Sequence, residues 1–99
     1  MIGFKKGVDY KIDGAVKILM IANDVYKSLG EDCIVTSLME GKHMKGSKHY
    51  IGNAVDFRTR TLNNAQKRIA KKLLAEGLGR DYDVVLEATH FHVEYDPKD

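Results

Sequence analysis

The stretch Ser47-Lys-His-Tyr-Ile-Gly-Asn-Ala-Val-Asp-Phe-Arg58 ends in an alternating segment that predicts a β-strand over residues 53–58. In a strand, successive side chains point to opposite faces, so Val55 and Phe57 share one face and Asp56 lies on the other. Since the aliphatic face belongs in a core, we expect Asp56 on the open face of a sheet.

A second polar segment, residues 83–95, predicts a β-hairpin with Ala88 and Thr89 as its two-residue turn. Ala-Thr is not among the favoured tight turns, but a four-residue loop would keep the same side-chain parity. The expected cross-strand pairs are Leu86–Phe91 and Val84–Val93 on an apolar face, and Glu87–His90 and Val85–His92 on the other face. Glu87 and His92 then become diagonal neighbours, about 7 Å apart at the backbone.

Two helices flank the central stretch. Asp13 is the expected N-cap of the first helix, and Gly30 is the expected C′ residue just past its end. Its apolar face comprises Ala15, Ile18, Leu19, Ala22, Val25, Tyr26 and Leu29. Asn63 or Asn64 caps the second, Gly77 or Gly79 ends it, and its expected apolar stripe is Leu62, Ala65, Ile69, Leu73 and Leu74.

The remaining segments are short. Residues 1–12 are irregular or form a short strand with Phe4, Val8 and Tyr10 as core anchors, residues 33–37 are a strand, and residues 38–50 are a polar loop. The basic run Lys67, Arg68, Lys71 and Lys72 is interpreted as a solvated helix face. The whole pattern predicts a small α+β domain over residues 1–99, with an antiparallel sheet, two helices packed on one face and a metal site on the other.

Composition narrows the function classes. The 99 residues fit one domain, and a net charge of +2 is too small to indicate nucleic-acid binding by bulk electrostatics. Cys33 is the only cysteine, which excludes an internal disulfide and a paired-cysteine zinc finger, and we interpret it as a buried, inert thiol. No signal peptide or membrane-spanning run is recognisable, so we expect synthesis in the cytoplasm and no membrane partner.

The polar residues of the two segments suggest metal chemistry. His49 stands just before Gly52, in the approach to the strand that carries Asp56, and the hairpin contributes His90 and His92. Three nitrogen or oxygen ligands leave one tetrahedral position open for water, which is typical of catalytic zinc. Such a site lowers the pKa of water and polarises a carbonyl, and it needs a general base nearby, for which Glu87 has the right group and placement.

The pattern Ser47-x-His49-x-x-Gly52-x-Ala54-x-Asp56, followed by His90-x-His92, resembles a family of zinc peptidases. These are the zinc D-Ala-D-Ala carboxypeptidases and the phage L-alanyl-D-glutamate endopeptidases, whose superfamily also holds the D-alanyl-D-alanine dipeptidases and the hedgehog signalling domain. The resemblance runs from about Cys33 to the end of the chain. The short length and the wording around His49 are most similar to small phage or prophage members.

The resemblance implies a role for each site residue. His49, Asp56 and His92 would be the ligands of Zn²⁺, and Glu87 falls where the family carries its catalytic base. His90 would be a transition-state partner outside the ligand set, and Ser47 would contact the substrate. Family members often carry an arginine after a Thr-Ser pair, but here Thr36-Ser37 is followed by Leu-Met-Glu, so Lys42 or His43 is the expected replacement.

The sequence therefore predicts a zinc metallopeptidase, a hydrolase that cuts peptidoglycan stem peptides and acts in cell-wall degradation after its release, as an endolysin does. Whether it is a D-Ala-D-Ala carboxypeptidase or an L-Ala-D-Glu endopeptidase stays open. We expect a monomer with no nucleic-acid partner. The alternative is a zinc-binding structural or interaction module of hedgehog-like fold, with weak activity or none.

Overall fold

The computed structural model describes residues 2–4, 16–39, 42–43, 50–51 and 54–96, and it describes residues 2, 4, 39, 42–43 and 50–51 by their backbone only. The elements in chain order are β1 (Ile2–Phe4), α1 (Val16–Ser28), β2 (Cys33–Met39), β3 (Lys42–His43), β4 (Tyr50–Ile51), β5 (Ala54–Arg58), α2 (Asn64–Leu78), β6 (Tyr82–Leu86) and β7 (His90–Tyr95). The expected N-cap Asp13 and the anchors Val8 and Tyr10 lie outside the described residues, and Phe4 is described by its backbone only.

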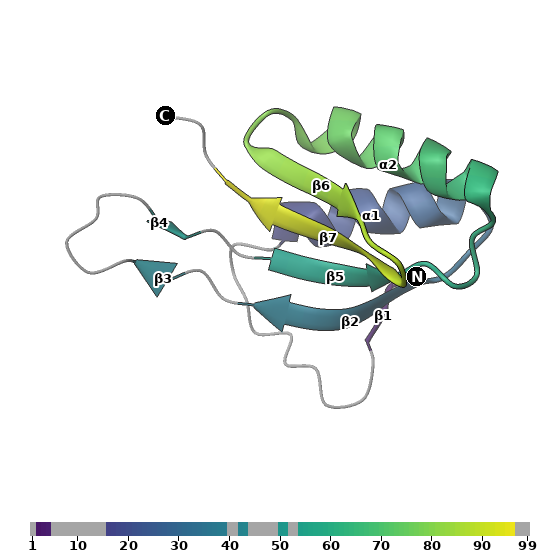
Figure 1. The fold of residues 1–99 in the computed structure, drawn as a ribbon, viewed down its shortest axis with the longest axis horizontal. Coiled ribbons are helices and arrows are strands. Elements are labelled where there is room, and N and C mark those ends of the chain that lie inside the picture. The colour runs from purple at the N-terminus through teal and green to yellow at the C-terminus, as the bar shows by residue number, and fades with distance from the viewer. Residues whose placement is uncertain (1, 5–15, 40–41, 44–49, 52–53, 97–99) are drawn as a thin grey trace.

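The main sheet has five strands in the order β1-β2-β5-β7-β6 (Figure 1). Strands β2, β5, β7 and β6 pair antiparallel, and β1 joins the β2 edge in parallel. Both helices contribute to one core on the same face of this sheet, with the buried side chains of Val35, Val55, Phe57, Phe91 and Val93. The α+β prediction is confirmed, and no helix of the described residues covers the opposite face of the sheet, called the open face below (Figure 1).

The predicted hairpin has the predicted register. Leu86 pairs with Phe91, Val84 with Val93, and Val85 with His92, while the backbone N–H of Glu87 donates to the carbonyl of His90 at 2.8 Å. Phe91 and Val93 are fully buried, whereas Val85 is 47% exposed on the open face. The alternation of apolar and polar residues was sufficient here because only one register buries the whole apolar set.

The predicted loop over residues 38–50 is wrong at both ends. Strand β2 continues to Met39. The short strands β3 (Lys42–His43) and β4 (Tyr50–Ile51) pair with each other in a separate two-stranded sheet. The alternation did not reveal the longer strand because β2 contains a bulge. Val35 pairs with Phe57, and Ser37 pairs with Asp56, so two steps along β2 correspond to one step along β5. The extra residue shifts the parity, so Leu38 pairs with the core residue Val55.

Helix α2 begins and ends as capping rules require. The Asn63 side chain accepts from the backbone N–H of Gln66 at 2.8 Å, and the Gln66 side chain accepts from the N–H of Asn63 at 2.9 Å. The helix ends before Gly79, whose φ of +93° favours glycine. Gly77 therefore lies inside the helix and does not end it, and a Cβ at this position would come within 2.9 Å of Ile21 on α1.

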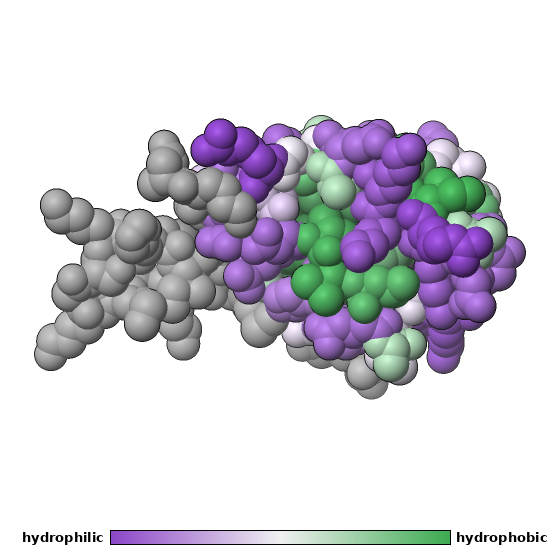
Figure 2. Space-filling model, turned by 45° about the horizontal axis from the view of Figure 1, so that its top comes forward, coloured by the Kyte–Doolittle hydropathy of each residue, from purple (hydrophilic) through white to green (hydrophobic). Residues whose placement is uncertain are grey.

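The predicted apolar stripe of α2 is partly wrong. Leu62 and Leu74 are buried, but Ala65, Ile69 and Leu73 are exposed, and Ala70 and Leu78 complete the buried side instead. The close approach at Gly77 turns the Ala70–Leu74–Leu78 line inward, so Ile69 and Leu73 are left at the surface. Figure 2, with the α2 side brought forward, shows hydrophobic side chains between hydrophilic ones there.

The predicted helix of residues 16–28 and the predicted burial of Cys33 are confirmed, while Ala15 lies outside the described residues and Leu19 and Leu29 are only partly buried. Ile18, Ala22, Val25 and Tyr26 are buried, and Gly30 follows the helix with a φ of +75°. Cys33 is fully buried, and this burial raises the pKa of its thiol to about 12. At neutral pH the thiol is therefore protonated and unreactive.

Replacing Asn63 with alanine should destabilise the fold by about 1 kcal/mol, since it leaves an N-terminal N–H of α2 without its acceptor. The matched control is Asn64→Ala, one residue into the helix, where the side chain is exposed and not part of the cap. Urea unfolding monitored by circular dichroism measures both. An Asn63→Ala midpoint equal to that of wild type would show that the cap carries no stability.

Candidate active site

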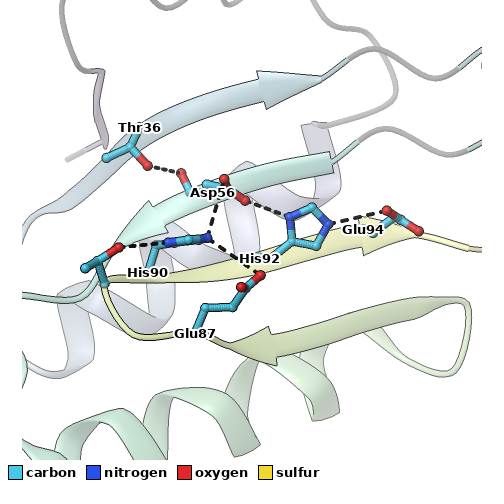
Figure 3. Close-up of polar contacts among 7 residues, drawn as sticks. Thr36, Asp56, Glu87, His90, His92 and Glu94 are labelled. Carbon is cyan, nitrogen blue, oxygen red and sulfur yellow. Dashed lines mark hydrogen bonds and ion pairs between the residues drawn. The ribbon is translucent and has the colours of Figure 1, made fainter.

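Asp56 lies at the centre of a polar cluster on the open face (Figure 3). It pairs with His92 across β5 and β7, and its Oδ1 is 2.8 Å from His92 Nδ1. Its other oxygen, Oδ2, is 3.6 Å from His90 Nε2, which is ion-pair distance. One carboxylate thus faces both histidines of the His-x-His pair, each with a different oxygen.

Glu87 reaches the cluster from the end of β6. Its Oε1 is 3.7 Å from His90 Nε2, so that nitrogen lies between two carboxylates. On the other side of the ring, Thr89 Oγ1 is 3.1 Å from His90 Nδ1. With the Thr89 hydroxyl donating to Nδ1, the ring proton sits on Nε2 and points toward Asp56 and Glu87.

Glu94 was not singled out from the sequence, yet it contacts His92. Its Oε1 is 3.3 Å from His92 Nε2, the ring nitrogen remote from Asp56. Metal-binding histidines commonly donate their second ring N–H to a carboxylate, which fixes the ring and its tautomer. The sequence pattern could have indicated this contact, because His90, His92 and Glu94 are each two residues apart in one strand and therefore share a face.

The two carboxylates set the charge state of His92. Burial lowers the pKa of His92, but hydrogen bonds to Asp56 and Glu94, together with their negative charges, outweigh burial and leave this pKa raised. A proton on His92 is therefore held more firmly than on a free imidazole, and in the protonated ring each nitrogen donates to one of the two carboxylates. Metal binding requires an unprotonated nitrogen, so protons compete with a metal ion at this residue.

The cluster is accessible from solvent. The side chains of Asp56, His92 and His90 are 18%, 23% and 27% exposed, and that of Glu87 is 50% exposed. The β2 bulge brings Ser37 opposite Asp56 and lets the Thr36 hydroxyl donate to the Asp56 carbonyl at 3.4 Å. These groups therefore line a surface that a substrate can reach, which an ordinary core histidine does not.

The donor set fits zinc. Imidazole nitrogen and carboxylate oxygen are common zinc ligands, and tetrahedral bonds of about 2.1 Å separate ligand atoms by about 3.4 Å. His92 Nδ1 and Asp56 Oδ1 are already 2.8 Å apart, about 0.6 Å less than that separation. Glu94 would then keep its contact with the remaining nitrogen of His92.

The other predicted site residues are only partly placed. His49, the expected third ligand, and Ser47 lie outside the described residues. Lys42 and His43 form β3, which pairs with β4, and only their backbone is described. The structure thus brings together Asp56, Glu87, His90 and His92 of the predicted set.

A separate acidic group lies at the far end of the hairpin. Among the described residues, Asp83, Glu94 and Asp96 have carboxylate oxygens within 4.8 Å of one another. An all-oxygen set favours magnesium, calcium or manganese over zinc. This group is therefore distinct in chemistry from the expected zinc site, although the two share Glu94.

Comparison with protein-family models, with curated proteins and with solved structures finds no match to this chain. The resemblance to zinc peptidases therefore rests on the motif residues of the sequence alone. No helix within the described residues is long and apolar enough to cross a membrane.

Replacing Glu94 with glutamine should weaken zinc binding about 10-fold, because the amide keeps an acceptor for His92 Nε2 but loses the charge that favours the N–H there. Competition with a zinc chelator measures the affinity. Glu76→Gln on α2, which changes the same charge at an exposed site, is the matched control. Equal affinities for the Glu94→Gln variant and wild type would exclude an orienting role for Glu94.

Proposed function

We propose that this protein is a zinc-dependent peptidase that hydrolyses peptide bonds of peptidoglycan stem peptides. The observation that supports this most strongly is the gathering of Asp56, His92, His90 and Glu87 on one accessible face, within 2.8–3.7 Å of their neighbours. Asp56 comes from β5, His90 and His92 come from β7, and Glu87 follows the end of β6, while Asp56 and His92 lie 36 positions apart in the sequence.

The residues have separate proposed roles. Asp56 and His92, with His49, would hold the zinc ion, and Glu94 would orient His92 through its second ring nitrogen. Zinc, when bound, makes water more acidic and polarises the scissile carbonyl. Glu87 and His90 stay outside the ligand set, and both remain free to contact water and substrate.

Glu87 is the proposed general base. Its carboxylate is half exposed and lies 3.7 Å from His90 Nε2, so it can take a proton from the attacking water and return it to the leaving amine. His90, with a proton on Nε2, can donate to the carbonyl oxygen as negative charge develops there. Its contacts with Asp56 and Thr89 hold the ring in the orientation that this donation requires.

Incubation of the zinc-loaded protein with purified stem peptides tests the proposal. We expect release of either a terminal D-Ala or the fragments of an L-Ala–D-Glu cleavage, identified by mass spectrometry, and loss of the product when zinc is chelated. The matched control is the same peptide set with the protein heat-unfolded. A zinc-loaded, folded protein that cuts none of these bonds would instead indicate the zinc-binding interaction module.

A further inference from the structure

His90 lies between two carboxylates, one from β5 and one from just after β6 (Figure 3). Its Nε2 atom is 3.6 Å from Asp56 Oδ2 and 3.7 Å from Glu87 Oε1. Both distances exceed the range of about 2.7–3.2 Å for an N–H···O hydrogen bond, whereas His92 Nδ1 lies within that range, 2.8 Å from Asp56 Oδ1. The three atoms at His90 are therefore gathered without a hydrogen bond among them.

A shared metal ion accounts for this spacing. Tetrahedral bonds of about 2.1 Å place ligand atoms about 3.4 Å apart, so the two distances at His90 lie within about 0.3 Å of that separation. One imidazole nitrogen and two carboxylate oxygens are all ligands that zinc accepts. The two negative charges of Asp56 and Glu87 also balance the charge of a divalent cation.

Thr89 provides the outer contact that a metal-binding histidine commonly makes. Its Oγ1 is 3.1 Å from His90 Nδ1, and a hydroxyl group can accept a hydrogen bond as well as donate one. When an ion takes the lone pair of His90 Nε2, the ring proton resides on Nδ1 and donates to Thr89 Oγ1. The contact that orients the free ring therefore also orients the metal-bound ring.

Closing these three ligands around an ion requires one side chain to move. The three atoms are not all within 4.8 Å of one another, a limit that only the acidic group at the far end of the hairpin meets among the described residues. Asp56 is held by His92 at 2.8 Å, so Glu87, whose side chain is half exposed, is the group that turns toward the ion. Ordering an exposed side chain costs conformational entropy, which makes the site a weak one.

We propose that His90, Asp56 and Glu87 form a second, weaker site for a divalent transition-metal ion, with zinc as the ion to test first. Asp56 bridges the two ions, with Oδ1 on the side of His92 and Oδ2 on the side of His90. The consequence for activity rests on the proposed peptidase function. The second ion occupies the carboxylate of Glu87 and the Nε2 atom of His90, which are the proposed base and carbonyl donor, so zinc beyond one equivalent inhibits turnover.

Titration of Zn²⁺ into the metal-free protein tests the site without turnover. Isothermal titration calorimetry resolves the binding steps, and the imidazole nitrogen shifts of His90 and His92 show which ring binds in each step. We expect His92 to respond to the first equivalent and His90 Nε2 to respond only to the second, in a weaker step. His90 shifts that stay unchanged in a large excess of zinc, or that change with the first equivalent, would overturn the proposal. A second step that perturbs only the acidic group at the far end of the hairpin would overturn it too.

Variants locate the second ion. Glu87→Gln removes a ligand and should abolish the second step while the first equivalent binds as before, and Glu76→Gln on α2 should retain both steps. Thr89→Val removes the acceptor for the Nδ1 proton and should weaken the second step about 10–100-fold, whereas Thr61→Val in an exposed turn should leave it unchanged. A Glu87→Gln protein with a native spectrum and a second step of wild-type affinity would contradict the site.

Turnover separates this site from the peptidase proposal. If stem peptides are cleaved, the second equivalent of zinc should lower kcat at least about 10-fold, because a positioned general base contributes about 10²–10⁴-fold. The midpoint of this inhibition should equal that of the His90 shift, and full turnover with His90 bound to zinc would overturn the inhibitory role. If His90 takes up the second equivalent but no peptide is cleaved at any zinc level, the metal site stands and the peptidase proposal fails.

Discussion

Replacing Glu87 with glutamine should lower kcat on the cleaved stem peptide by 10²–10⁴-fold, the usual contribution of a positioned general base. The amide has nearly the same shape but cannot accept the proton of the attacking water. Zinc content and fold should be unchanged, since Glu87 is half exposed and lies outside the proposed ligand set. Single-turnover hydrolysis, with zinc analysis of the same sample, measures both quantities.

The control for this variant is Glu76→Gln, because Glu76 is an exposed glutamate on α2, away from the open face, with only a 3.9 Å contact to Lys72. It should retain wild-type turnover. A Glu87→Gln enzyme as fast as wild type would rule out the base. Loss of zinc together with turnover would instead make Glu87 a ligand, and the proposed division of roles would be wrong.

Replacing Asp56 with asparagine should weaken zinc binding by more than the 10–100-fold that is typical for residues one step removed from a metal. Asp56 would be a ligand itself, and its carboxylate also contacts both His90 and His92. Turnover should fall in parallel with zinc occupancy. A chelator competition assay gives the affinity, and the activity of metal-saturated samples shows whether excess zinc restores function.

Asp24→Asn is the matched control, since Asp24 is an exposed aspartate on α1. The state of the fold can be followed by the buried Cys33 thiol, which should resist alkylation in both variants and react only after unfolding. If the Asp56→Asn protein is folded and binds zinc as tightly as wild type, the metal lies elsewhere. The Asp83, Glu94 and Asp96 group would then be the first place to look.

Much of the open face could be predicted because alternation in a strand has only two outcomes. Once Val55, Phe57, Phe91 and Val93 are assigned to the core, Asp56 and the His-x-His pair must share the other face. The spacing of apolar residues was insufficient for α2, where a tertiary contact decides which side of the helix is buried. The packing of Gly77 against Ile21 sets which side of α2 is buried, and no periodicity in the sequence contains that contact.

The same limit applies to the site. The β2 bulge moves Ser37 opposite Asp56, and only the register reveals it. Glu94 lies in the predicted hairpin segment but was given no role. An acidic residue two positions from a histidine indicates no contact by itself, and only the distance to His92 Nε2 shows one.

The most direct test of the zinc site is X-ray absorption at the zinc edge of the purified, zinc-loaded protein. The proposed ligands predict one tightly bound zinc per chain, with only nitrogen and oxygen neighbours at about 2.0–2.2 Å and the outer-shell scattering of two imidazole rings. Failure to retain zinc, or a spectrum with sulfur or with no imidazole among the neighbours, would contradict the assignment of His49, Asp56 and His92 as its ligands.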